Sequence, residues 1–375
     1  MRDDRLTPGE TGWRIARANQ FAFIIDAADY FKHVKAVMLR ARHRILLIGW
    51  DFDARMTFER GDKTLPGPNQ LGAFLYWMLW IRPDLEVYPF DRIWVGLTPV
   101  ALVNQISSRR IHFAVDGAHP TGAVPIAAEH TTWPSSLKPM LRDVDVGIAR
   151  TSPELDRRRE VREVEALDLA AIAAARHTIY LENQYLAARR LVDALAARLE
   201  EDDGPEILVV LPRRGNNPLE RQAMDSARHR LIHLLWAAGD RHRLGVYWPV
   251  TDEGTPIYVH SKVLIVDDRL LRIGSSNLNN RSMGFDGECD VAIEADPDSP
   301  RDDDVRRQIT SVRDHLVSEH LCVSVADFRE GAARWRVVAT GHRGTARGWQ
   351  DFASAHREHC RRRGRPFGGE RPDGS

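Results

Sequence analysis

The feature that most constrains the fold of this chain is a repeated unit of helix followed by strand. Residues 41–50 read ARHRILLIGW, and residues 175–184 read ARHTIYLENQ. Apolar residues recur at helical spacing just before each copy, over 31–41 and over 164–173. Each copy then continues as a short apolar strand. Two such units predict an α/β protein with two related halves, each built on a central sheet flanked by helices.

The composition sets the broad class of protein. A chain of 375 residues has room for one large domain or two ordinary ones, and 43% hydrophobic with 28% charged residues is typical of globular proteins. The formal net charge is zero, which argues against nucleic acid as the main partner without excluding it. Three widely spaced cysteines show neither a disulfide framework nor metal-ligand spacing. We therefore expect no metal, no cofactor and a reducing cytoplasm.

No segment predicts a leader or a membrane span. The first ten residues lack the apolar core of a secretion signal. The longest apolar run, residues 71–81, is too short to cross a bilayer. We expect a cytoplasmic protein whose contact with a membrane, where it has one, is peripheral and at the inner face.

A second stretch of the chain carries the chemistry. Residues 260–267 read HSKVLIVD, which is an H-x-K-x4-D pattern. Alternation along a strand over 257–267 would place His260 and Lys262 on one face. An imidazole can attack phosphorus or protonate a leaving alcohol, and an ammonium can neutralise a phosphoryl oxygen. Only five of the 53 basic residues are lysines, so a lysine inside this pattern is informative.

A glycine-led loop follows the pattern and suits the same oxygens. Residues 274–282 read GSSNLNNRS. Gly274 lets the backbone come close to a ligand, and hydroxyl, amide and guanidinium donors follow it. We expect phosphate contacts from four residues of this loop, namely Ser275, Asn277, Asn279 and Arg281.

Polar residues elsewhere are expected to support this site from behind. Glu182, Asn183 and Gln184 end the second strand of the repeat, and polar side chains at the carboxyl end of a strand commonly face a ligand in α/β sheets. Glu288 and Asp290 follow the glycine-led loop, where they could orient His260.

These patterns resemble the signature of the phospholipase D superfamily over about residues 20–325. The resemblance implies an α/β fold of two pseudo-repeated halves with mixed central sheets, over 20–150 and 151–330, the first half shortened. It also implies a phospho-histidine mechanism, in which one histidine attacks phosphorus and another protonates the leaving group. The nucleophile usually comes from the first motif of such a pair. His260 would then be the general acid/base, with Lys262 on the phosphate and Asp267 supporting the site.

The chain carries one H-x-K-x4-D motif where the family uses two. The two copies of the repeat are offset by 134 residues, which places the first motif near residue 126. The sequence around residue 126 has no H-x-K-x4-D pattern, and Pro134 would interrupt a strand over residues 131–138. The flanks at 111–123 and 143–151 still resemble the family. We infer that a block holding the first motif has been deleted at about residues 123–131.

The remaining elements follow the apolar pattern. Strands are predicted over 206–212, 244–249 and 270–273, with a helix over 217–237. Residues 357–375 are rich in Arg, Gly and Pro and predict a disordered tail.

The sequence therefore predicts a phospholipase D-like phosphodiesterase that hydrolyses or transfers phosphatidyl groups of phospholipids, including cardiolipin-synthase-like exchange. Its partners would be a phospholipid and an acceptor, either water or an alcohol. Two alternatives stay open. One is a homodimeric, nuclease-like phosphodiesterase that pairs His260 from two copies. The other is a catalytically impaired remnant of the family that still binds phospholipid or phosphate.

Overall fold

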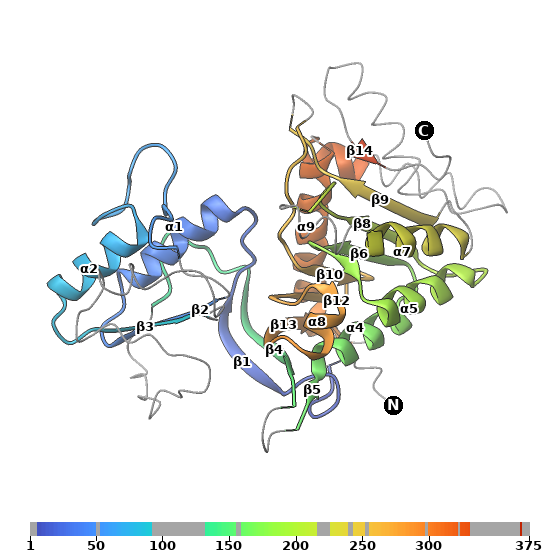
Figure 1. Cartoon of the computed structure of the whole chain (residues 1–375), viewed down its shortest axis with the longest axis horizontal. Coiled ribbons are helices and arrows are strands. Elements are labelled where there is room, and N and C mark those ends of the chain that lie inside the picture. The colour runs from blue at the N-terminus through green and yellow to red at the C-terminus, as the bar shows by residue number, and fades with distance from the viewer. Residues whose placement is uncertain are drawn as a thin grey trace. The chain divides into compact units, whose positions relative to one another are not determined.

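The chain forms two compact units, one of residues 1–21 with 140–375 and one of residues 22–139. The computed structural model describes residues 6–49, 53–91, 132–154, 159–215, 226–238, 243–251, 255–296, 299–321, 323–330 and 368–369. Figure 1 shows the elements of both units, which are treated separately below. Among the described helices, none is both long and apolar enough to cross a membrane.

The larger unit is built on a mixed, ten-stranded sheet. Its strands, in spatial order, are β1 (Arg14–Phe21), β4 (Leu141–Ser152), β13 (Glu288–Glu294), β11 (Leu270–Gly274), β10 (Val263–Val266), β6 (Thr178–Glu182), β8 (Glu206–Val210), β9 (Leu244–Trp248) and β14 (Gly368–Gly369). The tenth strand, β5 (Val161–Arg162), pairs with β4. β6, β8 and β9 run parallel, and β10 runs antiparallel to both of its neighbours. A separate parallel pair joins β7 (Leu186–Ala187) to β12 (Leu278–Asn279).

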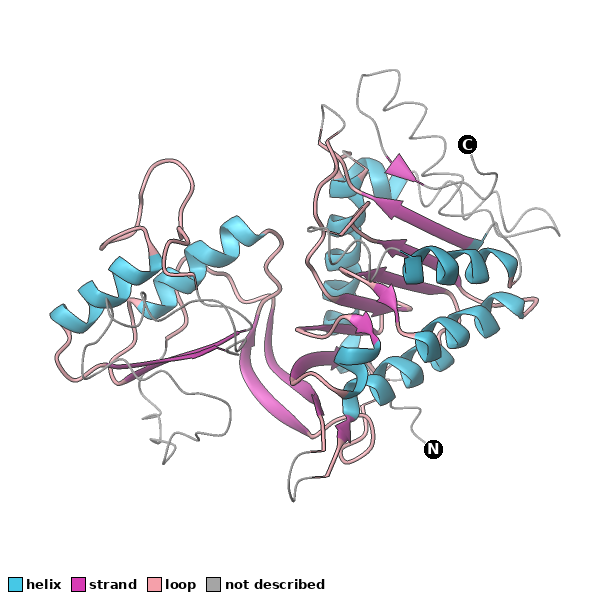
Figure 2. Ribbon diagram, in the orientation of Figure 1, coloured by secondary structure: helices cyan, strands magenta, loops and turns pink. Residues whose placement is uncertain are grey.

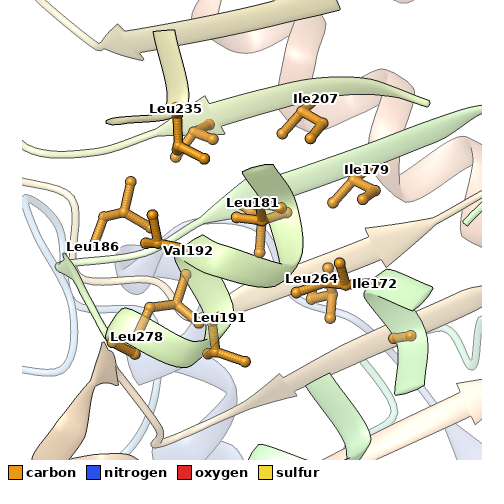
Figure 3. Packing of buried hydrophobic residues seen from close by; sticks show 14 of the residues in the cluster. Ile172, Ile179, Leu181, Leu186, Leu191, Val192, Ile207, Leu235, Leu264 and Leu278 are labelled. Atoms are coloured by element: carbon orange, nitrogen blue, oxygen red, sulfur yellow. The ribbon is translucent and has the colours of Figure 1, made fainter. Parts of the chain in front are cut away.

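Helices pack on both faces of this sheet (Figure 2). They are α4 (Glu163–Ala174), α5 (Arg189–Glu200), α7 (Ser226–Ala237), the short α8 (Asn280–Gly284) and α9 (Asp303–His320), with a 3₁₀ turn at Pro300–Asp302 before the last. The buried core joins α4, α5 and α7 to alternate residues of β6, β8, β9 and β10, as Figure 3 shows for part of it.

The helix α5 illustrates why this sequence forms an amphipathic helix. Its buried residues are Leu191, Val192, Leu195, Ala196 and Leu199, which is the i, i+1, i+4, i+5, i+8 pattern of one helical face. The strand β6 alternates in the same way. Ile179 and Leu181 belong to the core under the helices, so Tyr180 and Glu182 lie on the opposite face of the sheet.

The smaller unit contains α1 (Ala27–Met38), β2 (Arg44–Gly49), α2 (Leu71–Ile81) and β3 (Glu86–Asp91). β2 and β3 pair in parallel, and both helices contribute to one apolar core with Ile45 and Val87. An ion pair is buried in this unit. Lys35 Nζ lies 2.9 Å from Glu59 Oε1, and Thr64 donates its backbone N–H and its hydroxyl to the same carboxylate. These bonds hold the pKa of Glu59 at about 2 against the effect of burial.

The structure confirms the α/β class and the repeated helix–strand unit. Both copies form as predicted, α1 with β2 and α4 with β6. The strand predicted over 257–267 is shorter than expected. Only Val263–Val266 is a strand, because β6 ends at Glu182 opposite Val263 and the preceding residues have no partner on that side.

The predicted division at 150/151 falls inside β4, which belongs wholly to the larger unit. Of the helix predicted over 217–237, residues 226–237 form α7, and the rest lies outside the described residues. The expected location of a first motif near residue 126 and the inferred deletion at 123–131 also lie outside them. So does the predicted disordered tail over 357–375, except for the two residues of β14.

Candidate active site

One row of paired residues crosses the large sheet and defines the edge at which the site lies. The row runs through Ile148, Val291, Ile273, Val263, Glu182, Val210 and Tyr247. The chain just beyond this row, on each strand, is therefore brought to the same edge. Lys262, Asn183 and Gly274 all lie there, although they are far apart in sequence.

His260 and Lys262 precede β10 at this edge. His260 is exposed, and its ring stacks on that of Tyr258 with the centroids 6.4 Å apart. Lys262 is buried, with 6% of its surface exposed. Its Nζ donates to the carbonyl of His260 at 2.8 Å and to Gln184 Oε1 at 3.3 Å. The ammonium is thereby tied to the backbone of the residue that carries the imidazole.

The segment Glu182-Asn183-Gln184 holds the site together from β6. The Asn183 amide accepts from the backbone N–H of Leu278 at 3.1 Å and donates to the carbonyl of Ser276 at 3.4 Å. Gln184 accepts from Lys262 and donates to the Tyr258 hydroxyl at 2.7 Å. Asn183 therefore fixes the glycine-led loop, and Gln184 fixes the segment before β10.

Glu182 acts on the opposite face of the sheet. It is buried and accepts hydrogen bonds from the hydroxyls of Ser261 and Tyr180 and from His320 Nε2, the last at 3.3 Å. Burial opposes ionisation of Glu182, yet the bond and charge of His320 and the two hydroxyls hold the pKa of its carboxyl below its usual value. An ionised Glu182 thus anchors Ser261, the residue between His260 and Lys262.

The glycine-led loop begins at the end of β11. A Cβ on Gly274 would lie 2.0 Å from Asp290 Oδ1, so this position requires glycine because a carboxylate occupies the space. Asp290 accepts from the backbone N–H of Ser276 at 3.1 Å and from its hydroxyl. Ser275 donates to Glu288 at 2.5 Å. Asn277 keeps a buried side-chain Oδ1 without a hydrogen-bond partner among the described residues. This oxygen can only accept a hydrogen bond, so a phosphate contact of Asn277 would have to come from its amide N–H groups.

Two residues expected on phosphate are engaged elsewhere. Asn279 is the N-cap of α8 and accepts from the backbone N–H of Ser282 at 2.8 Å. Arg281 pairs with Asp286, with Nη2 2.6 Å from Oδ1, and its guanidinium lies over the ring of Phe285. Asn279 caps the helix through its oxygen, and the Arg281 side chain is 55% exposed, so the phosphate contacts of both residues stay a prediction.

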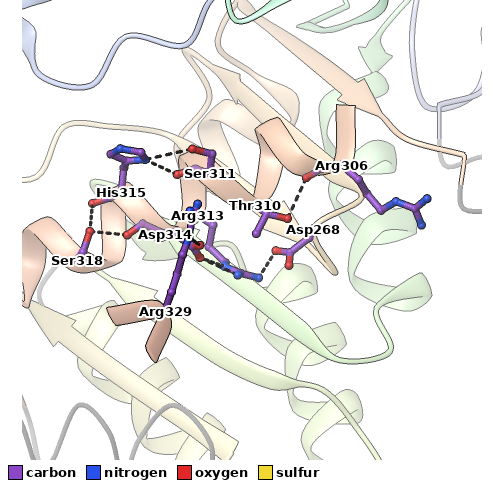
Figure 4. Close-up of polar contacts among 9 residues, drawn as sticks. All are labelled: Asp268, Arg306, Thr310, Ser311, Arg313, Asp314, His315, Ser318 and Arg329. Carbon is purple, nitrogen blue, oxygen red and sulfur yellow. Dashed lines mark hydrogen bonds and ion pairs between the residues drawn. The ribbon is translucent and has the colours of Figure 1, made fainter. Parts of the chain in front are cut away.

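Asp267 lies at the opposite end of β10 from Lys262. Its carboxylate accepts from the backbone N–H groups of Arg176, His177 and Thr178 at 2.7, 2.7 and 2.9 Å. It therefore supports the site indirectly, by tying the β10–β11 turn to the start of β6. The adjoining Asp268 pairs with Arg313 of α9 (Figure 4).

Sequence reasoning missed a buried charge cluster behind the loop. Arg272 of β11 is 1% exposed. It binds Asp168 of α4 through Nε at 3.0 Å and Nη2 at 2.6 Å, and its Nη1 lies 3.2 Å from Asp290. The available signal was a charged residue in the apolar strand LLRIG and another in the apolar helix. Charges at such positions are normally paired. Tyr258 and His320 had no comparable signal.

Electrostatics favour an anion at this edge. Burial lowers the pKa of Lys262 to about 8, while Glu288 and Asp290 act in the other direction. Burial also raises the pKa of Glu288, which the hydroxyls of Ser275 and Ser282 partly offset. Lys262 is then mostly cationic at neutral pH and costly to keep charged, a cost that an anionic ligand would relieve.

Chemically, the arrangement provides an imidazole, an ammonium and a loop with amide and hydroxyl groups at one edge. An exposed imidazole can act as nucleophile or as acid/base. The ammonium and the loop can stabilise negative charge on non-bridging oxygens. Such a set suits transfer of a phosphoryl group.

Comparison with known proteins gives one family. The sequence model of the family described as "Cardiolipin synthase, PLD-like domain" matches residues 169–307. The chain is 27% identical over 191 residues to a cardiolipin synthase of Halalkalibacterium halodurans, covering 50% of this chain and 33% of the relative. It is 60% identical over 40 residues to phospholipase D zeta 2 of Arabidopsis thaliana, covering 10% and 4%. The chain thus spans a third or less of the length of these relatives.

A solved structure agrees with the sequence matches on the fold. The phosphatidylserine synthase of Haemophilus influenzae Rd KW20 superposes with a TM-score of 0.51 at 11% identity, over 82% of this chain and 86% of that chain. At that identity the likeness concerns the fold alone. The sequence matches and the shared fold agree: residues 169–307 of this chain are similar to the family of PLD-like domains, and the fold is that of a PLD-like protein.

Proposed function

We propose that this protein is a phosphodiesterase that hydrolyses or transfers the phosphatidyl group of phospholipids through a phospho-histidine intermediate. The observation that carries the proposal is the bond between Lys262 Nζ and the carbonyl of His260. A cation tied to the residue that carries an exposed imidazole supports transfer of a phosphoryl group.

The reaction would proceed in two displacements. In the first, an imidazole nitrogen bonds to phosphorus while the bond from phosphorus to the leaving alcohol breaks, and that alcohol takes a proton from a second imidazole. In the second displacement, the imidazole that protonated the leaving alcohol removes a proton from water or from an acceptor alcohol. The oxygen of that molecule then replaces the histidine on phosphorus. Lys262 and the loop bind the non-bridging oxygens throughout.

Two imidazoles are needed for this cycle, and the chain carries one H-x-K-x4-D motif. A second copy of the chain is the most direct source of the other. The oligomeric state is therefore part of the test. Monomer and dimer fractions separated by size-exclusion chromatography are assayed individually with bis(p-nitrophenyl) phosphate and with phosphatidylcholine in mixed micelles.

The decisive variant is His260→Ala, and the matched control is His177→Ala. His177 is also exposed and lies in the larger unit. Its bond to Asp267 is made by its backbone N–H and not by its side chain. We expect His260→Ala to lose at least about 10³-fold in turnover, since both imidazole roles contribute, and the control to stay within twofold. Activity confined to the dimer would mean that two copies form the site. Equal turnover by wild type and His260→Ala in every fraction would overturn the proposal and favour a binding-only remnant.

A further inference from the structure

A cation and an aromatic ring at the same edge of the sheet take no part in the proposed reaction. Val210 of β8 and Tyr247 of β9 lie in the register row that contains Val263 and Glu182. Arg213 and Trp248 follow them at the same edge as His260. The guanidinium carbon of Arg213 lies 5.6 Å from the centroid of the Trp248 ring, within the range of a cation–π contact.

The backbone that carries Arg213 is held in place. Arg228 of α7 donates to the carbonyl of Pro212 at 2.7 Å and to that of Arg213 at 2.8 Å. The neighbouring strand β9 also holds this turn, since the N–H of Leu211 donates to the carbonyl of Tyr247 at 2.9 Å. Arg213 is nevertheless exposed. Its guanidinium is therefore aimed by a fixed turn and an aromatic face while remaining open to a ligand.

This pair is continuous with the site. After Trp248 the chain turns back, and the N–H of Ile257 bonds to the carbonyl of Pro249 at 2.9 Å. Tyr258 comes next, and its ring stacks on His260. β8 is two strands away from β10, which corresponds to about 10 Å at the usual strand spacing. An arginine side chain extending from the end of β8 can reach a group between the two.

We propose that Arg213, seated on Trp248, binds a second anionic group of the substrate, a phosphate or a carboxylate on the part that does not react. The inference rests on the proposed function, and it deepens it from phospholipids in general to donors with an anionic head group. The guanidinium presents a planar fork that matches the oxygens of either group in a bidentate way. Lys262 and the glycine-led loop remain for the scissile phosphate.

Two pairs of lipids test the proposal, because one member of each pair carries a second anion; cardiolipin also carries two more acyl chains than its partner. Cardiolipin has a second phosphate that phosphatidylglycerol lacks, and phosphatidylserine has a carboxylate that phosphatidylethanolamine lacks. Each is offered in neutral-detergent mixed micelles to wild type and to Arg213→Gln. For one pair, we expect the variant to lose roughly 10–100-fold in kcat/KM on the lipid with the second anion, the range for a charge-assisted bond. On the other lipid of that pair, kcat/KM should change less than twofold. The pair that responds identifies phosphate or carboxylate.

Matched controls separate binding from structure. Arg214→Gln removes the adjacent exposed arginine of the same turn and should leave the preference unchanged. Trp248→Leu should weaken the preference by a few-fold, because the guanidinium loses the ring that orients it. Turnover of bis(p-nitrophenyl) phosphate, which has one anionic group, should match wild type in all three variants and reports an intact site.

A binding measurement keeps the inference testable without turnover. Calorimetric titration of the same lipids into the His260→Ala protein compares affinities with and without Arg213→Gln. If the wild-type protein shows no turnover, a preference that Arg213 controls in this binding measurement would sink the proposed reaction but sustain the anion subsite. Equal losses for both members of a pair, or no loss for either pair, would overturn the subsite.

Discussion

The two ends of β10 differ in how their polar groups are satisfied. At the Asp267 end, one carboxylate accepts three backbone N–H groups of the segment that starts β6. At the Lys262 end, a buried ammonium has a carbonyl and an amide oxygen as neighbours, and its pKa is lowered to about 8. The first end is stable as it stands. The second is strained by desolvation and suited to an anion.

This difference shows that a single short motif can divide its work between chemistry and structure. His260 and Lys262 lie where strands end and ligands can approach. Asp267, four strand residues further on, fastens a turn in which both Asp267 and Asp268 have left-handed backbone angles, φ 53° and 57°. Aspartate tolerates that conformation better than most residues. The four residues between Lys262 and Asp267 in the motif are therefore the strand β10, which separates the residues at the site from the residue that holds the turn.

Among the substitutions that compare the two ends of β10, replacing Lys262 should have the largest effect on activity, below only that of His260→Ala. We expect Lys262→Met to lower turnover of a soluble phosphodiester by about 10²–10³-fold at pH 7, because a preorganised charge on the phosphoryl oxygens is lost. Circular dichroism should show an unchanged fold. Turnover within fivefold of wild type would mean that the ammonium does not serve the reaction.

The pH dependence of Lys262 sharpens this point, since activity and stability should move in opposite directions. With a folded pKa of about 8 against 10.5 in the unfolded chain, the ammonium and its activity are lost as pH rises through 8. Between pH 8 and 10.5 the unfolded chain binds more protons, so this group adds stability as pH rises. Kinetics and urea unfolding from pH 6 to 10 measure both, and Lys262→Arg should abolish the fall in activity near pH 8.

Replacing Asp267, at the other end of β10, should lower stability and leave turnover nearly unchanged. Asp267→Ala leaves three backbone N–H groups without their acceptor, and we expect the free energy of unfolding to fall by about 2–4 kcal/mol. Turnover per folded molecule, measured at low temperature, should stay within threefold. Urea denaturation measures the first quantity. A large loss of turnover with unchanged stability would reverse the assignment of the two ends.

Glu182 lies on the face of the sheet opposite α4, α5 and α7 and accepts a hydrogen bond from Ser261, next to Lys262. Replacing Glu182 should therefore have an intermediate effect on activity. We expect Glu182→Gln to lower kcat about tenfold with KM unchanged, because the anchor of Ser261 weakens while the phosphate contacts stay in place. His320→Gln, which keeps a donor to the carboxylate, should cost about threefold. Steady-state kinetics on a soluble diester separate kcat from KM, and a change confined to KM would contradict a positioning role.

The smallest effect is expected at Asn279, which caps α8. Asn279→Ala should reduce the free energy of unfolding by about 1 kcal/mol, whereas Asn279→Asp should retain the cap. Affinity for inorganic phosphate should be unchanged in both variants. A tenfold weaker phosphate affinity in Asn279→Asp as well as in Asn279→Ala would return this residue to the ligand-binding set.

Much of the fold follows from local patterns. The helix–strand units, the apolar β10 and the loop at Gly274 could be predicted, because the spacing of apolar residues and the placement of glycine reflect local backbone geometry. The start of the strand at Val263 could not be predicted, since strand length depends on where the partner β6 ends. The capping bond of Asn279 and the ion pair of Arg281 were not predicted, for a similar reason, and their phosphate contacts stay predictions. Their partners, Ser282 and Asp286, are local, but the sequence alone does not say whether a polar side chain binds its neighbours or a ligand.

The sequence by itself determined the residues that we propose for the chemistry and the strand that follows them, because H-x-K-x4-D constrains residue type and spacing along one short segment. Only the tertiary structure decided which distant residues support them. Glu182 reaches Ser261, Gln184 reaches Lys262, and Arg213 stands at the same edge on Trp248. These neighbours are set by strand order and register, which bring together segments that no local pattern connects.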